Sequence, residues 1–85
     1  MASEDIYGRV IMVLAEYVSD RVTDIDVSSS LVNDLGMDSL ELMALATALE
    51  SEFGVRVPDD TMSETLTVGE LSVFIEYSLS VKANV

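Results

Sequence analysis

Apolar side chains recur every three or four residues along three separate stretches of this chain. That period places them on one face of an α-helix, because a half-buried strand would instead alternate apolar and polar residues. The stretches predict helices over residues 4–18 and 39–53 and a third helix that begins near residue 68. The predicted inward-facing residues are Ile6, Val10, Val13, Leu14, Tyr17 and Val18; Leu42, Leu45, Ala46, Leu49 and Phe53; and Val68, Leu71, Phe74, Ile75 and Leu79.

Helix boundary signals agree with this pattern. Asp38 stands three residues before Glu41, and Thr67 stands three residues before Glu70, which is the spacing of a capping box at a helix start. Gly54 follows the second stretch and suits the left-handed position just past a helix end.

The segments between these helices complete the predicted fold. Residues 19–38 form a long Ser- and Asp-rich loop, and we expect its aliphatic side chains to pin it to the helices, since unstructured loops of this length are uncommon. The segment DDTMSET, residues 59–65, predicts one short helix. We therefore expect an all-α, small four-helix bundle, with three longer helices, one short helix and a long loop between the first and second helices, in a single domain over residues 1–85. The aliphatic residues of the long loop are Val22, Ile25, Val27, Leu31 and Leu35.

Cysteine and histidine are both absent from the 85 residues. The chain therefore lacks the usual general base near neutral pH and every Ser-His or Cys-His pair, so we expect no enzyme and no catalytic residue. The loop from Asp24 partly resembles an EF-hand, but Ser29 replaces the glycine and Leu35 replaces the bidentate glutamate. We expect a solvated acidic loop and no built metal site, and weak binding of divalent cations by the loop stays open.

The net charge of the chain indicates which kinds of partner it can bind. Sixteen acidic against four basic side chains give a formal net charge of −12, which argues against nucleic acid and favours a partner with a basic surface. No apolar run reaches the roughly 18 residues of a membrane span, and the start MASEDIYGRV has no export-signal pattern. We expect a cytoplasmic monomer.

Ser39 lies where the acidic loop becomes the second predicted helix, in the stretch NDLGMDSLELM. Its hydroxyl is expected to be exposed beside free backbone N–H groups at the positive end of the helix dipole, where a phosphate ester is favourably placed. From these residues alone, the better interpretation of Ser39 is a small polar residue tolerated at a helix start, with Asp38 as the cap.

The wider stretch DLGMDSLELMALATALESEFGVRVP resembles the second helix of acyl carrier proteins, and TVGEL at residues 67–71 follows in the order and spacing of that family. The resemblance implies that Ser39 receives 4′-phosphopantetheine from coenzyme A, through a separate magnesium-dependent phosphopantetheinyl transferase. It also implies a carrier that holds acyl intermediates as thioesters for fatty acid, lipid or polyketide-type biosynthesis.

The same resemblance implies a docking surface around Ser39. Asp38 would help to bind magnesium and the basic transferase, and Glu41 would extend an acidic strip toward acyl-loading and acyl-processing enzymes with basic patches. Leu40 and Met43 fall outside the predicted core stripe and could form the apolar centre of this surface. Solvated helix residues, or a Met43 packed under the loop, are the plainer alternatives.

At some positions this chain has a different residue from the one that is usual in the acyl carrier proteins of fatty-acid synthesis. Ala44 stands where those proteins usually have another acid, and Thr47 replaces a larger apolar residue near the acyl cavity. We therefore expect a specialised stand-alone carrier. A peptidyl or aminoacyl carrier is the first alternative, although Gly36-Met37-Asp38-Ser39 favours the acyl type. An unmodified acidic helical adaptor for a basic protein is the second.

Overall fold

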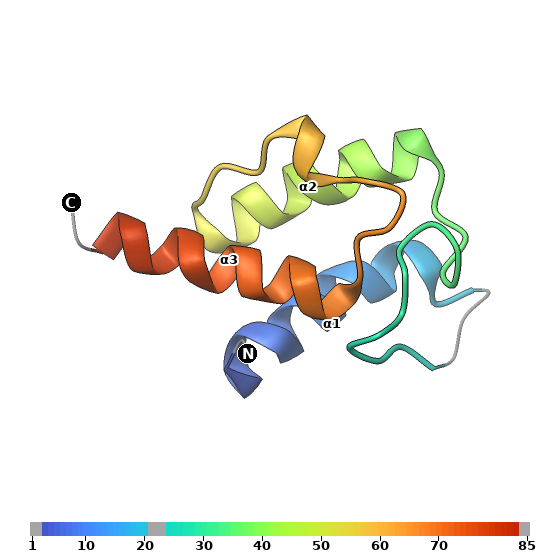
Figure 1. Ribbon diagram of the computed structural model, residues 1–85, viewed down its shortest axis with the longest axis horizontal. Helices are drawn as coiled ribbons and strands as arrows, with labels where there is room; N and C mark the ends of the chain where they lie inside the picture. Colours follow the sequence, from blue (N-terminus) through green and yellow to red (C-terminus); the bar gives the residue numbers. More distant parts are fainter. Residues whose placement is uncertain (1–2, 21–23, 84–85) are drawn as a thin grey trace.

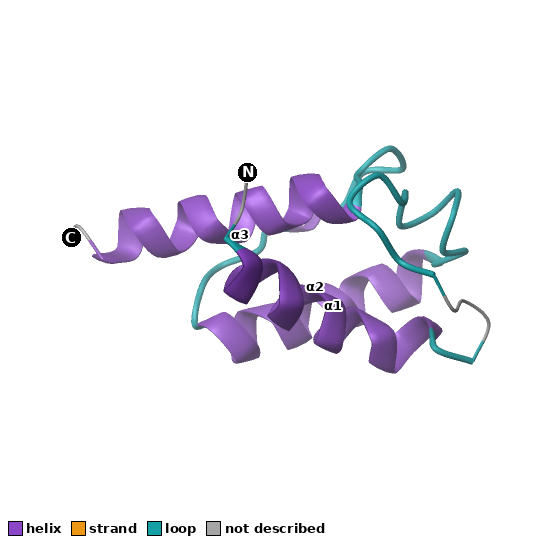
Figure 2. Cartoon of the chain, turned by 90° about the horizontal axis from the view of Figure 1, so that it is seen from below, coloured by secondary structure: helices purple, strands orange, loops and turns teal. Residues whose placement is uncertain are grey.

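A computed structural model describes residues 3–20 and 24–83 of the chain. It contains three α-helices: α1 (Glu4–Val18), α2 (Ser39–Phe53) and α3 (Val68–Ala83). Helix α1 packs against both α2 and α3. The loop that leads into α2 lies at one end of the bundle, whereas the connection from α2 to α3 runs back along the helices, so that α2 and α3 point the same way (Figure 1). Helices and loops account for the described residues, and no strand lies among them (Figure 2). The all-helical fold is confirmed.

The helix ends lie where the capping residues predict. The Asp38 carboxylate accepts a hydrogen bond from the Glu41 backbone N–H at 2.8 Å, and the Glu41 carboxylate accepts one from the Asp38 N–H at 3.4 Å. Thr67 and Glu70 make the same reciprocal pair at the start of α3. Gly54 ends α2 with a φ of 67°, in the left-handed region that glycine enters without a steric penalty.

The core forms where the helical stripes converge. Most of the predicted inward residues are buried, while Ile6, Tyr17, Leu42, Phe74 and Leu79 are half-buried and pack against the core. Met37 and Val57 are also buried, although neither belongs to a helix stripe. Both flank α2, so they fix the entry and the exit of the helix that carries Ser39.

The loop between α1 and α2 is tied to the start of α3 by backbone hydrogen bonds. Leu66 O accepts from Leu31 N at 3.0 Å, and Val68 N and Gly69 N donate to carbonyls of the loop at 2.9 Å each. A Cβ at Gly69 would meet Val27 O at 2.9 Å, so glycine permits this close approach. Leu31 is fully buried, Leu35 is nearly so, Ile25 is half-buried, Val27 stays exposed, and Val22 lies outside the described residues.

The predicted short fourth helix is not found. Its segment holds only a three-residue 3₁₀ turn, Asp59–Thr61, closed by a hydrogen bond from Thr61 N to Pro58 O at 3.0 Å. Ser63 N then donates to Thr61 O, and the Ser63 and Thr65 hydroxyls lie 3.5 Å apart. Ser63 N bonds to a carbonyl only two residues back, which is not the spacing of a helix, so the turn does not propagate.

None of the helices within residues 3–20 and 24–83 is long and apolar enough to cross a membrane.

Candidate functional site

Ser39 is the first residue of α2, and its side chain is exposed. The approach to it is held in place, because Met37 is 2% exposed and its N–H donates to Leu31 O at 3.0 Å. Gly36, with a φ of 68°, makes the preceding turn. A buried anchor two residues away therefore presents the serine hydroxyl on a fixed helix start.

Electrostatics at this helix start suit a phosphate ester. The capping box satisfies the N–H of Glu41, but the first N–H groups of a helix have no partner within the helix. These groups carry the partial positive charge of the helix dipole and stabilise anions near the first turn. Ser39 is the hydroxyl-bearing side chain at this end of α2.

The four predicted docking residues lie in the same turn and the next one. Leu40 is 79% exposed and Met43 is 58% exposed, so the plainer alternative for Met43, packing under the loop, is wrong. Asp38 is exposed, whereas Glu41 is half-buried and accepts a hydrogen bond in the capping box. The structure thus brings two exposed apolar side chains and two carboxylates together around Ser39.

A cavity of about 180 Å³ lies beside Ser39. Its other lining residues are Leu42, Met43, Ala46 and Met62, so its wall is mainly apolar. A flexible arm esterified to Ser39 fits this arrangement, because the hydroxyl is exposed and an apolar depression adjoins it. Sequence reasoning did not single out Met62, which reaches this site from the connection between α2 and α3, directly after the 3₁₀ turn.

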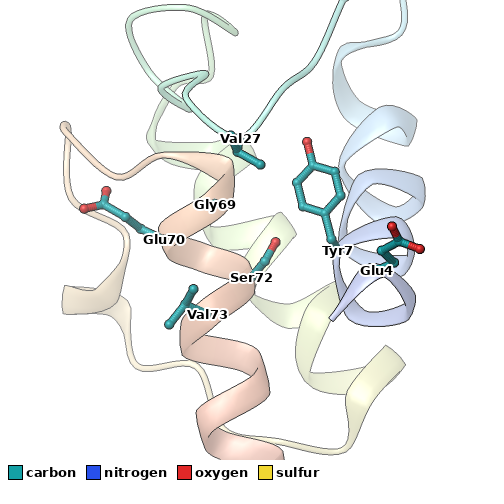
Figure 3. A pocket seen from close by; sticks show the side chains of 7 residues that line it. All are labelled: Glu4, Tyr7, Val27, Gly69, Glu70, Ser72 and Val73. Atoms are coloured by element: carbon teal, nitrogen blue, oxygen red, sulfur yellow. The ribbon is translucent and has the colours of Figure 1, made fainter. Parts of the chain in front are cut away.

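A larger cavity, of about 460 Å³, lies elsewhere, between α1, the long loop and the start of α3. Figure 3 shows Tyr7, Val27 and Val73 around it, one from each of these elements. Neither Ser39 nor any predicted docking residue lines it. Sequence patterns missed it because it needs three elements to meet.

The carboxylates of the acidic loop do not form a cluster in the part of the chain that the structure describes. Across the described ranges, no group of three or more Asp or Glu side chains is placed to hold a metal ion. Asp26 accepts hydrogen bonds from the Ser28 hydroxyl at 2.7 Å and the Ser28 N–H at 2.9 Å, and these contacts, led by the hydroxyl, lower its pKa below the ordinary value of 3.8. Asp34 accepts from the Ser30 N–H at 2.7 Å. Both carboxylates therefore stabilise turns.

Comparison with known proteins shows which class of protein this site defines. Residues 8–75 match the family of domains described as "Phosphopantetheine attachment site". An acyl carrier protein of Sinorhizobium fredii is 39% identical over 72 residues, which are 85% of this chain and 92% of that protein. An acyl carrier protein of Thermotoga maritima is 38% identical over 80 residues, which are 93% of this chain and 99% of that protein.

Solved structures agree with this class. Two solution structures of acyl carrier proteins from the actinorhodin polyketide synthase of Streptomyces coelicolor superpose on this chain with TM-scores of 0.62 and 0.63. Their identities are 29% and 32%, and each comparison covers 95% of this chain and 98% of the other. One is described as a 3,5-dioxohexyl form and the other as a 3-oxo-butyl form.

The chain belongs to the acyl carrier protein family. Its cofactor is covalently bound 4′-phosphopantetheine, and the exposed hydroxyl and apolar depression at the start of α2 fit such an arm. The relatives are carrier proteins, and this role implies contact with biosynthetic enzymes.

Proposed function

We propose that the chain is a carrier that holds acyl intermediates as thioesters on a 4′-phosphopantetheine arm attached to Ser39. The observation that carries the proposal is the position of Ser39. It is exposed at the first turn of α2, directly after the capping residue Asp38 and beside the apolar cavity. This supports Ser39 as the attachment residue within the matched region, residues 8–75.

Attachment requires a partner, because the chain has no histidine or cysteine that could activate Ser39. The Ser39 oxygen forms a bond to phosphorus while the pyrophosphate P–O bond of coenzyme A breaks. The serine proton passes to a base of the phosphopantetheinyl transferase, and adenosine 3′,5′-bisphosphate leaves. Asp38, exposed and adjacent, is the carboxylate we assign to the magnesium ion and the basic face of the transferase.

The bound arm supplies a thiol that forms thioesters, which this cysteine-free chain cannot do itself. The chain's own residues then present the arm. Leu40 and Met43 offer an exposed apolar patch beside Ser39, and Asp38 and Glu41 place negative charge at its edge. Such a surface matches partner enzymes that have an apolar centre and a basic rim, where the charges mainly raise the encounter rate and set specificity.

The pathway is a finer proposal. Relatives include bacterial acyl carrier proteins and carriers of the actinorhodin polyketide synthase, whose solved forms bear 3-oxo-butyl and 3,5-dioxohexyl groups. We propose that the chain serves a dedicated biosynthetic pathway and carries a polyketide-type or fatty acyl cargo. We also propose that residues 1–85 act as a monomer in the cytoplasm. Catalysis is assigned to the partners.

Intact-protein mass spectrometry tests the attachment. The wild type, Ser39→Ala and Ser51→Ala are incubated with coenzyme A, magnesium and a broad-specificity phosphopantetheinyl transferase. Ser51 is a matched control, because it is an exposed serine near the other end of the same helix. We expect one added phosphopantetheine on the wild type and Ser51→Ala, and none on Ser39→Ala.

Two outcomes contradict the proposal. Addition to a folded Ser39→Ala chain would mean that another residue holds the arm. No addition to the folded wild type, with more than one transferase, would favour the alternative of an unmodified acidic adaptor.

A further inference from the structure

The cavity beside Ser39 continues along α2. A second cavity, of about 360 Å³, shares Met43 and Ala46 with the first, so the two adjoin. The second is lined further by Thr47, Glu50, Arg56, Val57 and Pro58. Together they form a groove, hereafter the α2 groove, between α2 and the chain that follows it.

The chemistry of the α2 groove changes along its length. Near Ser39 its walls are mainly apolar, from Leu42, Met43, Ala46 and Met62. At the far end, the Thr47 hydroxyl donates to Met43 O at 3.2 Å, and the Glu50 carboxylate accepts from Val57 N at 2.8 Å. These two polar side chains therefore bond within the protein itself.

Arg56, also at the far end, differs from them. Arg9 pairs with Glu52 at 3.2 Å, and Lys82 donates to Gly54 O at 2.7 Å. Arg56 has neither an ion pair nor a hydrogen bond to any of the residues that the structure describes. An exposed guanidinium offers five N–H donors in a planar fork, which suits a carboxylate or carbonyl oxygen.

The reach of the arm matches the length of this groove. At a rise of about 1.5 Å per residue, the helix from Ser39 to Glu50 spans about 16 Å. The arm has about fourteen bonds from the serine oxygen to the sulfur, and three bonds of an extended backbone span roughly 3.5 Å, so the arm also reaches about 16 Å. Cargo on the sulfur of an arm in the groove would thus begin near the polar end.

We infer that Arg56 binds an oxygen-bearing group, a ketone or a carboxylate, near the thioester end of the cargo while the arm lies in the α2 groove. This makes Arg56 a residue that selects oxygenated cargo over plain alkyl chains. The inference rests on the proposed function, because it requires the arm on Ser39. Its chemistry is separate, since it depends on residues of the far end, which have no role in attachment.

Three cargoes and four proteins test the inference. The wild type, Arg56→Gln, Arg56→Lys and Arg9→Gln are each loaded with butanoyl, 3-oxobutanoyl or malonyl phosphopantetheine, and mass spectrometry verifies a single arm. Arg9→Gln makes the same charge change at the α1 residue that pairs with Glu52, away from the groove. The readouts are the NMR signal of the Arg56 side-chain N–H and the melting temperature of each loaded form relative to its own unacylated holo form.

In the wild type and in Arg9→Gln, we expect the ketone or carboxylate cargo to shift the NMR signal of the Arg56 side chain. The same cargo should raise the melting temperature by roughly 2–6 °C above that of the butanoyl form, because one exposed charge-assisted contact has about this effect in a domain of this size. Arg56→Gln should lose this difference, and Arg56→Lys should keep part of it. A response to malonyl alone assigns a carboxylate, and a response to 3-oxobutanoyl alone assigns a ketone.

Two results would overturn the inference while leaving the carrier role intact. One is a singly loaded Arg56→Gln that retains the full difference between cargoes. The other is a wild type whose cargo perturbs the signals of Tyr7 and Val73, in the separate cavity of Figure 3, and leaves Met43 and Thr47 unchanged. Failure of the wild type to accept any arm would instead refute the proposed function and this inference with it.

Discussion

Asp38 caps α2 and has a proposed second role in loading, and two substitutions can separate the cap from that proposed role. Its carboxylate accepts the Glu41 N–H at 2.8 Å as the N-cap of α2, and its charge lies beside Ser39. Asp38→Ala removes both the acceptor and the charge. Asp38→Asn keeps an oxygen acceptor of similar capping strength and removes only the charge.

The expected size of the effect follows from the cap. Loss of an N-cap acceptor costs about 1 kcal/mol of unfolding free energy, with a range of roughly 0.5–2, which lowers the melting temperature of a domain this size by about 4–8 °C per kcal/mol. Asp38→Asn should lose only part of this, because the interaction of an exposed charge with the helix dipole is worth about 0.3–1 kcal/mol at low salt.

Urea unfolding followed by far-UV circular dichroism measures the stability of each variant, and the rate of phosphopantetheine addition measures the second role. We expect Asp38→Ala to be the less stable variant and both variants to load slowly. If Asp38→Asn is destabilised as much as Asp38→Ala, then charge rather than the hydrogen bond stabilises this helix start. If Asp38→Asn loads at the wild-type rate, then the carboxylate has no role with the transferase.

Three further predictions concern Gly54 at the end of α2, Gly8 in α1, and Asp26 in the acidic loop. Gly54→Ala should destabilise the fold by about 1–2 kcal/mol in urea unfolding, because φ is 67°, a conformation that a residue with a Cβ rarely adopts. Gly8→Ala, where a Cβ meets nothing within 4 Å inside α1, should instead stabilise it by about 0.5–1 kcal/mol, and the same sign for both would contradict this reasoning. Hydrogen bonds from Ser28 lower the pKa of Asp26 in the folded chain, so its contribution to stability is present above pH 3.8 and is lost as pH falls through the lower folded value. An NMR titration of the Asp26 carboxyl should give a midpoint below 3.8, and a midpoint above it would reverse the sign.

Local features of the fold could be predicted because each depends on residues close in sequence. The capping boxes at Asp38 and Thr67 and the left-handed Gly54 follow from spacing alone, and the structure confirms all three. The short helix at residues 59–65 was the wrong prediction. There the apolar pattern was weak, and the backbone closes only a three-residue turn before it leaves helical bonding.

The site was predictable only in part. The motif around Ser39 indicated the helix start and the exposed side chains, because these belong to one continuous segment. The groove could not be predicted, since Met62 and Arg56 belong to the connection between α2 and α3, whose path back along α2 is set only by tertiary packing. Helix α3 is similar: Val73, Tyr77 and Val81 are exposed on a helix whose other face is buried, and periodicity alone does not tell which apolar residues will find a partner.

The hydrogen bonds between the long loop and the start of α3 also affect when the protein can function. Leu31, which receives the Met37 N–H and so positions the approach to Ser39, itself donates to Leu66 O. On the ribosome, the loop therefore cannot reach its final form until the chain has emerged through about the first turn of α3. Ser39, the proposed attachment residue, is therefore synthesised before the segments that hold its approach in place, and we expect the order in which these segments appear to disfavour premature loading of a nascent chain.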